Sequence, residues 1–97
     1  MNSHFVQINA PTFRCAPGVA WSAESDGIRL VAPDRSFTVR LAYPEAALWD
    51  FMARGVSETR ATVMMKHIAG FPDDVAASRF IAECLQGWHK QGLITPG

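Results

Sequence analysis

The sequence predicts a small α+β domain in which a three-stranded antiparallel β meander is followed by three α-helices. Two patterns support this fold class: large side chains alternate with small or polar ones from residue 19 to residue 41, and from Pro44 apolar residues recur at helical spacing. The connections between these segments are about two to five residues long, so consecutive elements should pack against one another. The helices are therefore expected to cover one face of the meander.

Three short strands separated by turn residues make up the expected meander. Residues 19 to 23 alternate large and small side chains, and Ser25-Asp26-Gly27 offers a turn whose glycine can take a positive φ. Residues 28 to 32 resume a strand, and Pro33-Asp34-Arg35 fits a type I turn with proline at its second position. The third strand then places Phe37, Val39 and Leu41 on one face and Thr38 and Arg40 on the other.

The segment before the meander has no sustained period. We expect residues 1 to 17 to form an N-terminal arm, in which Phe5, Val6 and Ile8 pack as a short strand. Residues 18 to 97 are expected to form the folded domain.

Start and stop signals delimit the three expected helices. Helix one should run from Pro44 to Gly55, helix two from its cap Ser57 to Gly70, and helix three from its cap Asp73 to Gly92. Helix three has the most regular pattern, with an inward stripe of Ala77, Ile81, Cys84 and Trp88. One flank of this stripe is formed by Ser78, Ala82, Leu85 and His89.

Composition and charge exclude several classes of function. Nine basic and nine acidic side chains give no net charge, so no broad positive field attracts nucleic acid. Cys15 and Cys84 are far apart and lack partners at metal-ligand spacing, so no metal or cofactor is expected. No signal segment or membrane span is present, which favours a cytoplasmic protein without a membrane partner.

The chain also lacks a recognisable catalytic set. His4, His67 and His89 stand apart from any nucleophile setting, and Cys84 is expected to be a small core hydrophobe rather than a reactive thiolate. We therefore expect a binding domain, not an enzyme.

Several segments resemble the PqqD-like family, named after coenzyme PQQ synthesis protein D. The resemblance runs from about Cys15 to Ile94 and is carried by Leu30-Val31-Ala32-Pro33-Asp34-Arg35, Val39-Arg40-Leu41, Ala46-Ala47-Leu48-Trp49, Gly55 and Gly92-Leu93-Ile94. Relatives commonly carry an Asn and a Thr before helix one, whereas this chain has Ala42 and Pro44, so Pro44 must start the helix by its fixed φ.

The resemblance implies a winged-helix fold that acts as a RiPP recognition element, that is, a domain that recognises ribosomally made and later modified peptides. Such a domain binds the leader of a precursor peptide and presents it to a maturation enzyme, often a radical SAM enzyme. The leader typically adds as a strand beside the third strand and lies against the third helix, which here correspond to residues 36 to 41 and 74 to 91.

The expected peptide-binding site combines this strand with one flank of helix three. Phe37, Val39 and Leu41 should face the helices, so that a peptide would meet their backbone and the opposite face. The helix flank is either a groove wall or core periphery, and the two arginines either pair with acidic leader residues or remain solvated. The expected site residues are Ser36, Phe37, Thr38, Val39, Arg40, Leu41, Ser78, Arg79, Ala82 and Leu85.

Two other functions remain open at this point. A winged-helix DNA-binding regulator would need basic residues at the start of its recognition helix, but helix three begins with Asp73 and Asp74. A non-catalytic subunit that stabilises an enzyme complex shares every feature above, and a homodimer is compatible with each alternative.

Overall fold

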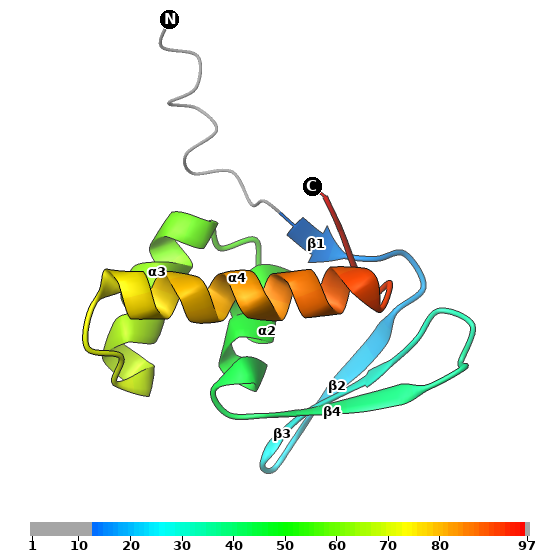
Figure 1. The fold of residues 1–97 in the computed structure, drawn as a ribbon. Coiled ribbons are helices and arrows are strands. Elements are labelled where there is room, and N and C mark those ends of the chain that lie inside the picture. The colour runs from blue at the N-terminus through cyan, green and yellow to red at the C-terminus, as the bar shows by residue number, and fades with distance from the viewer. Residues whose placement is uncertain (1–12, 97) are drawn as a thin grey trace, which may run out of the picture.

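A computed structural model describes residues 13–96, and its meander confirms the predicted fold class. Strands β2 (Ala20–Glu24), β3 (Gly27–Val31) and β4 (Thr38–Ala42) form an antiparallel sheet in the order β2-β3-β4. Figure 1 shows this meander projecting to one side of the helices. Each strand follows the one before it through a short turn, as the sequence predicted.

The two turns of the meander differ from the prediction in one respect. Gly27 opens β3 without a positive φ; a Cβ atom there would collide with the carbonyl oxygen of Leu41 on β4. Position 27 therefore requires glycine, because the backbones of β3 and β4 approach each other closely there. In the second turn the Arg35 amide donates to the Ala32 carbonyl at 2.9 Å, and Arg35 itself has φ 59°.

Helices α2 (Glu45–Ala53), α3 (Glu58–Ala69) and α4 (Asp74–Lys90) follow the meander. Both predicted side-chain caps are confirmed: Ser57 Oγ accepts from the Arg60 amide at 3.2 Å, and Asp73 Oδ1 accepts from the Ala76 amide at 2.8 Å. Pro44 precedes α2 without a side-chain cap hydrogen bond. None of the helices in residues 13–96 is long and apolar enough to cross a membrane.

A second, two-stranded sheet joins the two ends of the described chain. Strand β1 (Phe13–Cys15) pairs antiparallel with β5 (Ile94–Pro96), next to the C-terminal end of α4 in Figure 1. The neighbouring Ala16 is buried, and its amide donates to the Leu93 carbonyl at 3.0 Å. The end of the segment assigned to an arm is thus part of the packed structure, whereas the strand expected at residues 5 to 8 lies outside the described residues.

The core lies between the inner face of the meander and the three helices. Trp49 of α2 is fully buried, and its ring meets that of Trp88 on α4 in an edge-to-face contact with centroids 5.2 Å apart. The largest fully buried side chains are Trp49, Leu30, Met65, Ile81, Leu93 and Ile94.

The inward stripe of α4 differs from the predicted one at a single position. Ala77, Ile81 and Trp88 are buried as predicted, but Leu85 takes the fourth place and Cys84 is only half-buried. The two residues are neighbours on the helix, and turning the larger aliphatic side chain inward removes more apolar surface from water. Leu85 therefore belongs to the core and not to an exposed flank.

Candidate functional site

One edge of strand β4 is free of any partner strand within residues 13–96. The sheet order places it at one side of the meander, paired only with β3 among the described strands. The Ala32 amide donates to the Phe37 carbonyl at 3.1 Å, and hydrogen-bonded pairs alternate along an antiparallel ladder. By this alternation the backbone of Val39 and Leu41 turns towards β3, while the amides and carbonyls of Thr38, Arg40 and Ala42 point away from the sheet.

An open groove runs between this edge strand and α4. It has a free volume of about 420 Å³, and its apolar wall contains Val39 and Leu41 from the strand and Phe80 and Trp88 from the helix. Leu41 and Trp88 are also core residues, so the groove wall is held by the packing of the domain. The full lining is Val39, Arg40, Leu41, Glu45, Phe80, Glu83, Cys84, Gly87, Trp88 and Gln91.

Cys84 lies on the helix wall of this groove. Burial raises the pKa of its thiol to about 12, with a further contribution from the negative charges of Glu45 and Glu83. A thiol with that pKa remains protonated near neutral pH and is a poor nucleophile. Its position on the groove wall is consistent with an apolar contact surface.

Arg40 belongs to a cluster of ion pairs on the sheet. Its guanidinium lies 3.1 Å from Glu24 and 3.0 Å from Asp26, and Glu24 also binds Arg29 at 3.0 Å. Arg29 and Arg40 are directly opposed on β3 and β4, a like-charge pairing that costs stability unless an anion lies between them. Glu24 supplies that anion, so Arg40 is engaged within the domain.

The structure places the strand half of the predicted site at the free edge. Val39, Arg40 and Leu41 line the β4–α4 groove and Thr38 begins the strand. Phe37 was expected to face the helices, but it precedes β4 and is exposed, so this prediction was wrong. Ser36 is also exposed, and its amide donates to Asp34 Oδ1 at 2.9 Å.

The helix half of the predicted site lies elsewhere. Ser78, Arg79 and Ala82 line a different groove, between α3 and α4, together with Thr59, Thr62, Val63, Asp74 and Val75. Each residue turns an α-helix by about 100°, so Ala82 and Cys84 lie on opposite flanks of the buried stripe. The predicted strand residues and these helix residues are therefore not brought together.

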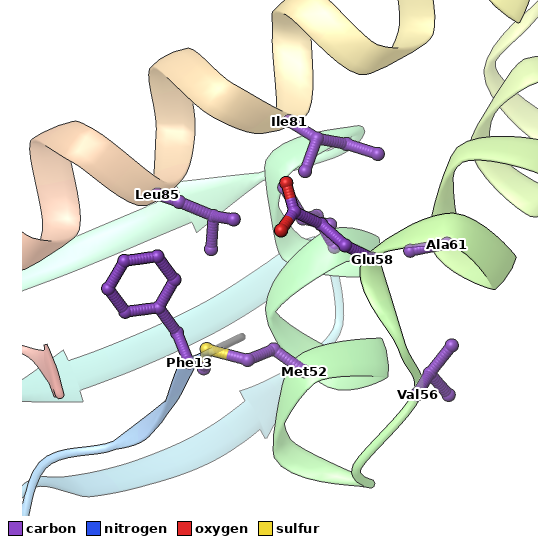
Figure 2. A pocket seen from close by; sticks show the side chains of 8 residues that line it. Phe13, Met52, Val56, Glu58, Ala61, Ile81 and Leu85 are labelled. Carbon is purple, nitrogen blue, oxygen red and sulfur yellow. The ribbon is translucent and has the colours of Figure 1, made fainter. Parts of the chain in front are cut away.

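Leu85, the remaining predicted site residue, faces a small, partly open pocket. Figure 2 shows it pointing from α4 towards Phe13 and Met52. The free space there is about 20 Å³, close to the room that one water molecule needs. This pocket is a packing defect of the core and has no room for a ligand in this conformation.

The groove residues that sequence analysis missed come from the other flank of α4 and from the start of α2. Phe80, Glu83, Gly87 and Gln91 line the groove from α4, and Glu45 lines it from the first turn of α2. The one available signal was Gly87, because a glycine within a helix sacrifices stability and often has a packing or functional reason. The part of the chain that the structure describes holds no cluster of three metal-ligating side chains.

The comparisons with known proteins identify a fold but no family. No protein-family model matches the sequence, and no curated protein matches it either. The fold is that of a small α+β domain whose meander precedes its helices. The same fold occurs in TbiB1, solved in complex with the TbiA(beta) leader peptide, with a TM-score of 0.74 over 84% of this chain and 93% of that chain at 13% identity.

Proposed function

We propose that this protein is a non-catalytic binding domain that holds the leader of a ribosomally synthesised precursor peptide in the β4–α4 groove and presents it to a modifying enzyme. The observation that carries the proposal is a free strand edge directly beside a groove with an apolar wall. An extended peptide pairs with such an edge through its backbone and places alternate side chains into the groove.

The likeness to TbiB1 supports this assignment, because that protein was solved with a leader peptide and shares the fold over most of both chains. The PqqD-like resemblance of the sequence points to the same class of ligand. The proposed contacts are the backbone of residues 38 to 42, the backbone of Gly87 and the side chains of Phe80, Cys84 and Trp88. The flank formed by Ser78, Arg79 and Ala82 has no part in this site.

We propose no reaction for the domain itself. The only thiol on the groove wall has a pKa raised to about 12, which removes it as a thiolate nucleophile near neutral pH. The maturation enzyme, a radical SAM enzyme in many systems of the PqqD-like type, would supply the chemistry.

A peptide selection followed by amide mapping tests the proposal. The immobilised full chain is used to enrich random peptides of about 15 residues, long enough to span a strand and its flanks. Each recovered peptide is then titrated into isotope-labelled protein. We expect the largest amide shifts in residues 38 to 42 and 80 to 91. Failure to enrich any peptide above an unrelated domain, or shifts confined to the β2–β3 hairpin or α3, would refute the proposed site.

A further inference from the structure

Two carboxylates belong to the lining of the β4–α4 groove. Glu45 lies in the first turn of α2, shortly after β4 ends at Ala42, and Glu83 lies on the side of α4 that lines the groove. Both residues are exposed. Within residues 13–96, neither carboxylate takes part in an ion pair. Their charges are therefore available to a molecule in the groove.

The cations near these carboxylates do not neutralise them. Arg40 is the one basic residue in the groove lining, and it is bound to Glu24 and Asp26. Arg79 precedes Glu83 by one helical turn but lines the α3–α4 groove and forms no ion pair with it. Within residues 13–96, the groove lining thus carries two negative charges that no ion pair offsets.

Cys84 lies on the same groove wall, close to both carboxylates. Burial is the main reason that its pKa is raised to about 12, and the charges of Glu45 and Glu83 raise it further. The fields of both carboxylates therefore reach the same point on the groove wall. A cation placed near that point would be stabilised by the fields that disfavour a thiolate there.

The rest of the groove wall suits an apolar side chain of the peptide and not a basic one. Val39 and Leu41 on the strand are apolar, and Phe80 and Trp88 on α4 are apolar residues on either side of Glu83 along the helix. In an added strand, every second side chain points to the same face. One extended peptide can therefore direct an apolar side chain to this wall and a basic side chain to the carboxylates.

We propose that Glu45 and Glu83 make the groove selective for a peptide that carries Lys or Arg where the added strand passes Ala42, with an apolar residue on the same face towards Val39. This inference rests on the proposed function, because it names the chemistry of the peptide that the groove accepts. The apolar wall and the free edge define the site, and the two carboxylates define its preference.

The test uses the peptides enriched on the unchanged full chain. We expect Lys or Arg to recur at one position of the aligned peptides, two or four residues from an apolar one. Affinities are then measured for the chain with Glu45→Gln, with Glu83→Gln and with both changes, using Glu58→Gln as the matched control. Glu58 is a glutamate at the start of α3 that lines the small pocket next to Leu85 and not the groove.

Each groove substitution should weaken binding roughly two- to fivefold, as for partly exposed ion pairs, and both together about tenfold. Replacing the basic residue of the peptide by Gln should weaken its binding to the unchanged chain about as much as the double substitution does. The same peptide change should have little further effect on binding to the double variant. Raising the salt concentration from about 0.05 to about 0.5 M should weaken binding in the same way, but only when the groove keeps its carboxylates and the peptide keeps its basic residue. Amide spectra confirm that each variant is folded.

The outcomes separate the two proposals. Neutral or acidic peptides that shift residues 38 to 42 and 80 to 91, with affinities unchanged in the double variant, would overturn the charge preference and leave the peptide-binding function standing. Equal losses with Glu58→Gln would also overturn it, because the effect would then not be local. If no peptide binds at the groove, both proposals fall together.

Discussion

Replacing Gly87 by leucine should raise the stability of the domain while abolishing most of its peptide binding. Gly87 lies in the last turns of α4, its φ is not positive, and a Cβ atom there would meet nothing within 4 Å. The first side-chain atom of a leucine at this position therefore meets no neighbour, and we expect the rest of the side chain to occupy the groove that Gly87 lines. The change thus separates loss of binding from loss of fold.

The expected magnitudes follow from helix propensity and from burial. Removing a glycine from a helix gains roughly 0.5–1 kcal/mol, and we take the lower value of about 0.5 kcal/mol because Gly87 is near the helix end. In a domain of this size that gain raises the melting temperature by about 2–4 °C. If the new side chain displaces one apolar anchor of the peptide, about 1.5–3 kcal/mol of burial is lost. That loss corresponds to a dissociation constant increased about 10- to 150-fold.

Thermal melting by circular dichroism and titration with an enriched, labelled peptide measure the two effects. Ala82→Leu is the matched control, because it adds the same side chain to the same helix on the flank that lines the α3–α4 groove. We expect it to leave the dissociation constant unchanged. If Ala82→Leu weakened binding and Gly87→Leu did not, the peptide would lie on the α3 side of α4, and the choice of groove would be wrong.

Four further expectations concern the strand, the core, the thiol and the charge balance. Thr38→Pro, which removes an outward-facing backbone donor, should weaken peptide binding more than Thr38→Ala does, provided that amide spectra show both variants folded. Trp88→Ala should destabilise the domain by roughly 3–5 kcal/mol, because Trp88 is 4% exposed and packs on Trp49; a melting temperature close to that of the unchanged chain would contradict the core assignment. Because the pKa of Cys84 is raised from 9.0 to about 12 in the folded state, the contribution of its neutral thiol is fully present below about pH 9 and is lost as the pH rises towards 12. The free energy of unfolding should therefore fall over this window, and less steeply after Cys84→Ala; parallel curves would exclude the thiol as the cause. Duplex DNA at micromolar concentration should show no salt-dependent gel shift, because the chain has no net charge, and a shift lost on adding salt would favour the regulator instead.

Local signals in the sequence were sufficient to predict most of the fold. The caps at Ser57 and Asp73 act within three residues of their own position, so they are readable without knowledge of the tertiary structure. The same holds for Gly70, whose left-handed φ of 73° ends α3. Alternation over residues 37 to 41 likewise predicted the strand that carries the free edge.

Features that depend on long-range packing could not be predicted in this way. A helical wheel is nearly symmetric about its apolar stripe, so the sequence of α4 does not reveal which flank faces β4. The predicted flank of Ser78 and Ala82 turned out to face α3, and Cys84 and Gly87 face the strand. The choice between them is made by the way in which α4 crosses the rest of the domain.

The β1–β5 pair and Gly27 escaped prediction for a related reason. Strands of three residues are too short to show a period, and β1 and β5 lie at opposite ends of the described chain. Gly27 correctly indicated a turn, but glycine is required there because the Leu41 carbonyl on the facing strand leaves no space for a Cβ atom. Neither partner is visible from the neighbouring residues in the sequence.

The pairing of β1 with β5 determines how the domain would respond to mechanical force. Phe13 is opposite Pro96, so tension applied at the two ends of the described chain would pull the strands apart from one side. The load would then fall on one hydrogen bond at a time, each contributing only about 1 kcal/mol. The β1–β5 sheet would therefore open before the force acted on the three-stranded meander. Tension between the two ends would thus release β1 while leaving the β4 edge in place.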